Sequence, residues 1–462
     1  MFGKFKKIHF IGIGGVGMSG IAEVLLNLGF EVSGSDVAKS DYTRTLEKLG
    51  AQIFIGHRRE NITNTDVVVW SSAITRDNPE ILEALSRKIP TIRRAEMLAE
   101  LMRLKKGIAV AGTHGKTTTT SMVSLILTNA GLDPTIVIGG KLNNIGSGAK
   151  LGAGEYLVAE ADESDGSFMK LFPQYSIVTN IDTDHLDHYG TLENIKQTFL
   201  KFIDKLPFYG LCVLCIDDDN IKSILPEIRR RYITYGFLDD ADITIANYKI
   251  KWPGAIFDVM LKKEKLGVIE LSVPGRHNVL NSLAAIGIAT ELEIPFDIIR
   301  DTLKNYRGVQ RRFQIKCNIN NILVVDDYGH HPSELQATLS AARSNSNKRV
   351  IAVFQPHRYT RTKLLFDDFG KSFNDADIVI ITDIYAASEQ KIEGVTSELI
   401  INSLKKYGKE NVIYFDEFSK IVDYLLETAQ SGDIILTLGA GDIWKVSEEL
   451  SKKLIKKFAE RK

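Results

Sequence analysis

Residues 108–120 read Ile-Ala-Val-Ala-Gly-Thr-His-Gly-Lys-Thr-Thr-Thr-Thr, and this stretch decides how the rest of the chain is interpreted. Its first four residues form an apolar run typical of a buried strand, and residues 118–127 continue in a helical pattern. The small residues between them allow backbone N–H groups to turn toward an anion, and the start of the helix adds positive potential there. The pattern therefore predicts a loop that holds the phosphates of ATP.

Individual roles within this loop follow from the residue types. Lys116 is expected to reach the β- and γ-phosphates, and the Thr117 hydroxyl is expected to bind Mg²⁺. The other expected phosphate contacts come from the loop and the first helical turn, at Gly112, Thr113, Gly115 and Thr118. Val110 stands where the usual G-x4-G-K-[ST] pattern has its first glycine, so the loop is a shortened form. The alternative is an ordinary glycine turn without a ligand.

Outside this loop, apolar runs alternate with helix-like segments along almost the whole chain. Strands are expected at 8–13, 67–70, 108–111, 156–159, 177–180, 211–216, 322–325, 350–354, 378–382 and 434–438. Strands that alternate with helices indicate parallel sheets with crossover helices. The fold class is therefore α/β.

A second glycine-rich turn follows the first expected strand. Gly12-x-Gly14-x-x-Gly17 opens a helix, and Asp36 lies about 20 residues further on, after a second strand, as in dinucleotide-binding folds. The pattern predicts a pyrophosphate at that helix N-terminus. NAD, FAD and a UDP-sugar would all satisfy it, and a tight turn without a ligand is the remaining alternative.

The chain of 462 residues is long enough for two or three domains. Because one α/β unit seldom needs two phosphate loops, each glycine turn is assigned to its own domain. We predict a Rossmann-like domain over 1–106, a P-loop ATPase-type central domain over 107–312, and a Rossmann-like C-terminal domain over 313–462. The last boundary follows the polar, basic segment 308–313.

Composition excludes several functional classes. The 58 basic and 58 acidic residues cancel, which gives no electrostatic reason to expect nucleic acid or an anionic membrane as a partner. No apolar run is long enough to span a bilayer, and three cysteines do not make a disulfide framework, so a cytoplasmic location is expected. Cys212 and Cys215 lie in an apolar run and are interpreted as core residues.

Acidic and histidine residues after two central strands are candidates for metal binding. Glu160 ends the strand at 156–159 and is placed to hold Mg²⁺ directly or through water. Glu163 and Asp165, just beyond, are interpreted as parts of a solvated loop. In the segment 180–189, His185 is expected to join oxygen ligands on a second Mg²⁺; zinc is the alternative, and His188 is not expected to be a ligand.

The third domain has two dense polar segments, 326–332 and 355–362, which both follow expected strands. Parallel α/β sheets bind their ligands at this end of the strands. Arg358 and Arg361 are suited to a bidentate grip on a carboxylate or a phosphate.

Together these segments resemble the Mur ligases of bacterial cell-wall synthesis. The resemblance covers essentially the whole chain and rests on Gly12–Ala22, Gly112–Thr120, Glu160–Asp165, Asn180–Tyr189, Arg276–Asn281, Arg311–Phe313, Asp326–Pro332 and Gln355–Thr362, which occur in the family's order. The segment 354–361 is similar to that of the family member that adds alanine. The resemblance implies an ATP-dependent ligase of peptidoglycan precursor synthesis, with UDP-N-acetylmuramate and L-alanine as small-molecule substrates.

The resemblance also implies roles for single residues. The first domain would bind the UDP-sugar through Gly14, Gly15, Gly17, Met18, Ser19, Asp36 and Ser72, with Asn144 of the second domain at the muramoyl part. Asn281 would contact adenine, and Arg312 and Asp327 the ribose or the domain junction. Thr117 and Glu160 would bind one Mg²⁺ and His185 the other, with Mn²⁺ able to substitute. The region of the nascent amide and of alanine would be formed by Tyr328, His330, His357, Arg358 and Arg361.

The implied chemistry passes through an acyl phosphate, which the amine of alanine then attacks. Lys116, His330, His357, Arg358 and Arg361 are the candidate catalytic residues, and His330 is a candidate base. Several relatives carry a carbamylated lysine, for which no equivalent is assigned in this chain. The alternatives are another Mur-type or folate ligase, an NAD-dependent oxidoreductase and a regulatory ATPase. The sequence does not predict the oligomeric state.

Overall fold

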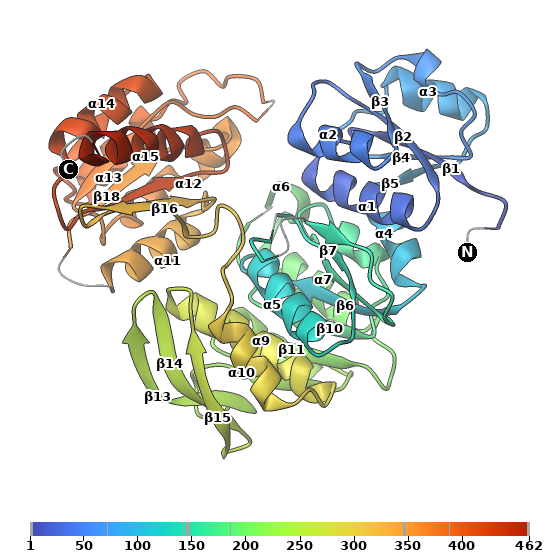
Figure 1. Cartoon of the computed structure of the whole chain (residues 1–462), viewed down its shortest axis with the longest axis horizontal. Coiled ribbons are helices and arrows are strands. Elements are labelled where there is room, and N and C mark those ends of the chain that lie inside the picture. Colours follow the sequence, from blue (N-terminus) through green and yellow to red (C-terminus); the bar gives the residue numbers. More distant parts are fainter. Residues whose placement is uncertain are drawn as a thin grey trace. The chain divides into compact units, whose positions relative to one another are not determined.

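The computed structural model describes residues 3–71, 73–140, 142–144, 148–184, 186–344, 348–387 and 389–459. The strands in these residues form three sheets, of five, ten and six strands (Figure 1). The chain divides into two compact units. The first comprises Met1–Asn247, Phe257–Ile269 and Leu280–Tyr306, and the second comprises Tyr248–Ile256, Glu270–Val279 and Arg307–Lys462.

The first sheet is parallel and carries the glycine turn of residues 12–17. In the order β3-β2-β1-β4-β5 it contains β1 (Lys7–Ile11), β2 (Glu31–Asp36), β3 (Gln52–Ile55), β4 (Val67–Trp70) and β5 (Thr91–Arg93). Its helical segments are α1 (Val16–Asn27), α2 (Asp41–Lys48), η1 (Arg59–Asn61), α3 (Pro79–Ser86) and α4 (Arg94–Met102). Because parallel strands end at one edge of a sheet, the glycine turn after β1 and Asp36 at the end of β2 lie at the same edge.

The second sheet carries the phosphate loop, in the order β15-β14-β13-β12-β11-β10-β6-β9-β7-β8. Its strands are β6 (Lys106–Ala111), β7 (Thr135–Val137), β8 (Ala149–Lys150), β9 (Tyr156–Glu160), β10 (Tyr175–Val178), β11 (Leu211–Cys215), β12 (Tyr232–Tyr235), β13 (Ile243–Lys251), β14 (Gly254–Leu261) and β15 (Glu264–Leu271). The helical segments are α5 (Lys116–Asn129), η2 (Ser167–Lys170), α6 (Leu186–Tyr189), α7 (Leu192–Ile203), α8 (Asp219–Ile224), η3 (Leu225–Glu227), α9 (Arg276–Glu291) and α10 (Phe296–Lys304). Strand β6 pairs in parallel with β10 and β9, so polar residues that follow these strands surround the loop.

The third sheet has the order β16-β17-β21-β18-β19-β20. Its strands are β16 (Gln314–Ile319), β17 (Ile322–Asp327), β18 (Val350–Phe354), β19 (Ile378–Ile381), β20 (Val412–Tyr414) and β21 (Ile434–Leu438). Its helices are α11 (Pro332–Arg343), α12 (Tyr359–Lys371), α13 (Glu398–Lys406), α14 (Phe418–Thr428) and α15 (Trp444–Ala459). Consecutive residues of β17, such as Val324 and Val325, belong to separate apolar clusters, because successive side chains of a strand point to opposite faces. Both faces of this sheet are therefore covered.

The expected α/β class is confirmed, and each expected strand overlaps a strand of the structure. The cysteine interpretation is also confirmed, because Cys212 and Cys215 are buried free thiols in β11. The strands β13–β15 at one side of the second sheet were not predicted. In the part of the chain that the structure describes, no helix combines the length and the apolar character that a bilayer crossing requires.

Candidate active site

The phosphate loop has the backbone that its glycines predict. Gly112 and Gly115 have φ values of +128° and +83°, which residues with side chains rarely adopt. A Cβ on Gly112 would lie 2.1 Å from Thr179 Oγ1, and a Cβ on Gly115 would lie 2.6 Å from Asn281 Oδ1. Both positions therefore require glycine, and α5 begins directly after the loop, at Lys116.

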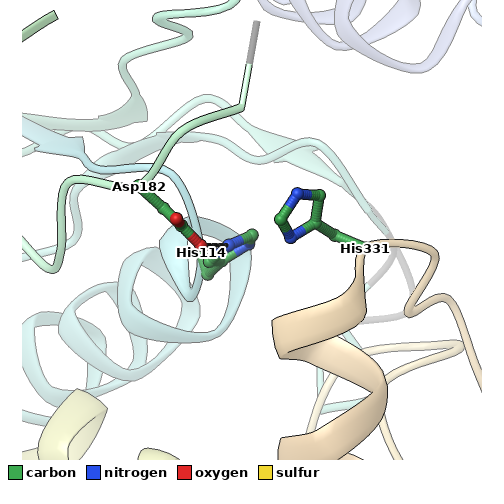
Figure 2. A group of neighbouring side chains, drawn as sticks. All are labelled: His114, Asp182 and His331. Atoms are coloured by element: carbon green, nitrogen blue, oxygen red, sulfur yellow. Dashed lines mark hydrogen bonds and ion pairs between the residues drawn. The ribbon is translucent and has the colours of Figure 1, made fainter. Parts of the chain in front are cut away.

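Residues that follow β10 hold the loop from the side. The Asn180 side chain accepts the His114 N–H at 2.8 Å and donates to the His114 carbonyl at 3.0 Å. The Asp182 N–H donates to Thr113 Oγ1 at 2.9 Å, and the Asp182 carboxylate lies 3.1 Å from His114 Nε2, an approach that Figure 2 shows. The segment after β10 thus supports a phosphate loop that lacks its usual first glycine.

Figure 2 also draws His331, which belongs to the second unit and is the N-cap of α11.

Lys116 is held by three acceptors. Its ammonium donates to the carbonyl oxygens of Gly112 at 2.6 Å and Thr113 at 2.9 Å, and it lies 2.8 Å from Glu163 Oε2. Glu163 is only 3% exposed, so the prediction that it belongs to a solvated loop is wrong. The chain turns back after it, where Gly166 N–H donates to the Glu163 carbonyl at 2.9 Å, and this turn directs the side chain inward. Asp165 is exposed, as expected.

The charges of this pair oppose the effect of burial. Burial raises the pKa of Glu163 to about 7, although the neighbouring Lys116 ammonium lowers it. Burial also lowers the pKa of Lys116, but the charges of Glu163 and Asp162 outweigh that effect, and its pKa is raised overall. Lys116 therefore stays charged, while Glu163 lies near its titration point at neutral pH.

Glu160 and Thr117 offer the oxygen ligands that Mg²⁺ prefers. Glu160 ends β9 in register with Val110 of β6, so its backbone lies beside the start of the phosphate loop. Its Oε1 accepts the N–H of Gly139 at 3.0 Å, which orients the carboxylate. Thr117 is the second residue of α5 and is half-buried. The donor set fits a magnesium ion, and both assignments remain predictions.

The glycine turn of the first domain is bound to the end of β2. The N–H groups of Gly12 and Ile13 donate to the Ser35 carbonyl at 2.8 and 3.0 Å, and Gly14 N–H donates to Asp36 Oδ2 at 2.8 Å. Asp36 therefore supports the turn itself in this structure. At the start of α1, the N–H groups of Met18 and Ser19 donate to the Gly15 carbonyl at 3.0 and 2.8 Å, whereas those of Val16 and Gly17 have no backbone acceptor among the described residues and are left for an anion.

Arg94, which was not predicted, lies between the first glycine turn and the acidic segment that follows β9. A Cβ on Gly17 would lie 2.9 Å from its guanidinium, and its Nη2 donates to Asp162 Oδ2 at 3.0 Å. A cavity of about 400 Å³ lies beside it, lined by Arg93, Arg94, Ala95, Asp165, Gly166, Ser167 and Lys170. In the sequence, Arg94 is marked only as a basic residue at the start of a helix, which is too common a feature to predict its role.

In the second unit, aromatic and basic side chains meet after β17 and β18. The His330 ring lies 5.5 Å from Tyr328 and 5.4 Å from His357 between ring centroids, and the His357 ring stacks on Tyr385 at 5.7 Å. Arg361 Nη1 lies 3.2 Å from His357 Nδ1, which therefore accepts a hydrogen bond. The structure thus brings these predicted residues of the third domain together.

Both histidines are uncharged at neutral pH. Burial lowers the pKa of His330 to about 4, and burial next to His330 and Arg361 lowers the pKa of His357 to about 3. His330 Nδ1 donates to the Tyr328 carbonyl at 3.0 Å, so its Nε2 is an acceptor. Arg358 is exposed, and its guanidinium has no ion pair or hydrogen bond among the described residues.

Four other predicted residues have structural partners. The Asp327 carboxylate accepts the N–H groups of Phe313 and Gly329, both at 2.7 Å, and thereby fixes the ends of β16 and β17. Arg312 lies 3.4 Å from Glu334. Asn281 is buried and accepts from Thr119 Oγ1 at 3.1 Å, and Asn144 Nδ2 donates to the Asn305 carbonyl at 3.2 Å. Ser72 and His185 lie outside the described residues.

Comparison with protein families agrees with this arrangement along the chain. Residues 7–106 match the Mur ligase family catalytic domain, residues 110–289 the Mur ligase middle domain, and residues 311–441 the Mur ligase glutamate ligase domain. The chain therefore belongs to the Mur ligase family.

Among its relatives, the UDP-N-acetylmuramate–L-alanine ligase of Geotalea uraniireducens is 57% identical over 98% of this chain and 99% of its own length. The enzyme of that name from Endomicrobium trichonymphae is 53% identical over 97% and 99%. Solved structures are similar as well, and two of them illustrate the range. The alanine ligase MurC of Thermotoga maritima has a TM-score of 0.82 at 31% identity, covering 99% of this chain and 100% of its own. A murein peptide ligase of Psychrobacter arcticus has a TM-score of 0.72 at 25% identity, covering 97% and 98%.

Proposed function

We propose that this chain joins L-alanine to the lactyl carboxylate of UDP-N-acetylmuramate and converts ATP to ADP and phosphate. The observation that carries the proposal is the Lys116 loop, placed in the same compact unit as a glycine turn suited to a pyrophosphate. The names of the relatives that align over nearly the whole chain support the choice of substrates. The reaction would supply peptidoglycan precursors, and its need for ATP places it in the cytoplasm.

The first step activates the carboxylate. A lactyl carboxylate oxygen attacks the γ-phosphorus, and the bond between that phosphorus and the β-phosphate oxygen breaks. The products of this step are ADP and an acyl phosphate. Both reactants are anions, so Lys116 would stabilise the charge that passes between them. Thr117 and Glu160 would hold a Mg²⁺ ion, which when bound screens the same charge. The amides at the start of α1 would hold the pyrophosphate of the sugar nucleotide.

The second step forms the amide. The uncharged amine of L-alanine attacks the acyl carbon, the bond between that carbon and the phosphate oxygen breaks in the tetrahedral intermediate, and the departing phosphate takes up the proton that the amine loses. Arg358 is exposed and carries no ion pair among the described residues, so it would bind the alanine carboxylate. His330 would accept a hydrogen bond from the amine through Nε2. Because its pKa is about 4, it would orient the amine rather than retain its proton.

Phosphate release by the purified chain tests this proposal. The assay contains ATP, Mg²⁺ and UDP-N-acetylmuramate, with one amino acid added at a time. Release with L-alanine but not with D-glutamate, together with the alanyl product by mass spectrometry, is expected. Release only with a peptide would instead indicate a murein peptide ligase. No release with any of these acceptors would contradict the proposal.

A further inference from the structure

The first domain buries one carboxylate that the proposed chemistry does not use. Glu80, in the first turn of α3, is fully buried. Its Oε2 accepts the Ser35 hydroxyl at 2.6 Å and lies 3.3 Å from His9 Nε2. Its Oε1 accepts Asn61 Nδ2 at 2.5 Å and the Arg58 N–H at 3.2 Å. One carboxylate thus joins β1, β2, η1 and α3.

Glu80 is ionised in this environment. Burial alone would raise its pKa, but the hydrogen bonds from His9, Ser35 and Asn61 outweigh burial, and the pKa is lowered. A buried charge is costly to maintain unless its partners are in place. The arrangement of its donors is therefore tightly defined.

The first connection from Glu80 to the glycine turn runs through Ser35. The hydroxyl of this residue is bound to Glu80, and its carbonyl oxygen accepts the N–H groups of Gly12 and Ile13. The hydroxyl oxygen also lies 2.9 Å from His57 Nδ1. A shift of Ser35 would therefore move the acceptor of two consecutive amides of the turn.

The second connection runs through Asn61. Its Nδ2 donates both to Glu80 and to the Gly56 carbonyl, the latter at 3.0 Å. Gly56 N–H in turn donates to the Asp36 carbonyl at 2.8 Å, and the Asp36 carboxylate accepts Gly14 N–H. Both connections reach the Ser35–Asp36 end of β2, which holds three successive amides of the turn.

We propose that Glu80 is a positioning residue for the sugar-nucleotide site: it fixes the end of β2 so that the glycine turn presents its later amides to a pyrophosphate. The inference rests on the proposed function, because it needs the turn to bind a sugar nucleotide. Glu80 itself has no exposed surface, so it would act through Ser35 and Asn61 and not by contact with the substrate.

Two variants test this role. Glu80→Gln keeps the shape but has a single acceptor oxygen for four donors, so at least two donors lose their partner. Ser35→Ala removes only the first connection and leaves Glu80 charged. Each is expected to raise KM for UDP-N-acetylmuramate about tenfold, a loss of about 1.4 kcal/mol. The KM for ATP and the kcat should stay within about twofold of the wild type. Calorimetric binding of UDP-N-acetylmuramate should weaken in parallel.

Asp66 provides the matched control. Its carboxylate accepts the N–H groups of Lys6 at 2.7 Å and Lys7 at 2.9 Å, at the opposite end of β1. Asp66→Asn should lower the melting temperature but leave KM for the sugar nucleotide unchanged. A merely structural role for Glu80 would give the same pattern in all three variants.

An unchanged KM in Ser35→Ala overturns the proposal, even if Glu80→Gln does not fold. An equal rise of KM for ATP also overturns it, since the effect would then not be confined to the first domain. Wild-type turnover is measured first. If the wild type forms no alanyl product, the proposed function has failed; if it turns over normally and Ser35→Ala behaves like it, only the positioning role has failed.

Discussion

Replacing Glu163 with glutamine tests how the phosphate loop holds its lysine. In the structure the Glu163 carboxylate lies 2.8 Å from the Lys116 ammonium, the group expected to bind the β- and γ-phosphates. ATP must therefore compete with Glu163 for Lys116. Glu163→Gln removes the competing charge with almost no change in shape, and we expect ATP to bind more tightly.

The magnitude follows from the contacts of Lys116. A hydrogen bond to a charged group contributes about 1.5–3 kcal/mol, so the loss of this competitor should lower the Kd for ATP by roughly tenfold to a hundredfold. Lys116 keeps the carbonyl oxygens of Gly112 and Thr113, so its ammonium retains two acceptors in the variant.

The pH dependence gives the sharpest readout. Because burial raises the pKa of Glu163 to about 7, its carboxylate is charged at pH 8 and neutral at pH 6. Calorimetry should therefore show tighter ATP binding by the variant at pH 8 and little difference at pH 6. A raised carboxyl pKa also means that this group destabilises the fold as pH rises from 4.5 toward 7, and the variant should lose that slope.

The control for this experiment is Asp165→Asn, which removes an exposed carboxylate two residues away. It should leave the ATP affinity unchanged at both pH values. Equal or weaker ATP binding by Glu163→Gln at pH 8 would refute the idea of competition and would indicate that Glu163 instead presents Lys116 to the nucleotide.

Three further substitutions give separate outcomes. Lys116→Ala should abolish phosphate release while calorimetry still detects UDP-N-acetylmuramate; near-normal turnover would remove this lysine from the mechanism. Gly112→Ala places a Cβ 2.1 Å from Thr179 Oγ1 at a φ of +128°, so chemical denaturation should show a loss of about 2 kcal/mol or more, and ATP binding should fail. Because the pKa of His330 is lowered to about 4, this residue destabilises the fold as pH falls from 6.5 toward 4. The melting temperature of His330→Gln should therefore fall less than that of the wild type over this pH range. An equal fall in both proteins would argue against the burial of His330 as an uncharged ring.

Features encoded by local spacing were predictable from the sequence. The phosphate loop needs only a strand, small residues, a lysine and a helix in succession, and all of them are present within 108–129. The strands at 67–70, 350–354 and 434–438 have the expected bounds, because continuous apolar runs in parallel sheets are buried on both faces.

Features that depend on contacts between distant segments were not predictable. Glu163 has the composition of a solvated loop, and only the turn at Gly166 directs it to Lys116, 47 residues away in the chain. Arg94 reaches Asp162 across 68 residues. The strands β13 and β15 include exposed stretches, such as most of 243–251, so they lack the continuous apolar runs on which the strand predictions rest.

The support of the phosphate loop from β10 has a consequence for the order in which the protein acquires its shape. The bonds from Asn180 and Asp182 to the loop span 66 to 69 residues, so they cannot form before β10 pairs with β6. Contacts between distant segments close late, because the intervening chain must first lose its freedom. A nascent chain that ends before β10 would contain the whole motif and yet lack the geometry that receives a nucleotide. Nucleotide binding can therefore serve as a marker that the central sheet has been completed.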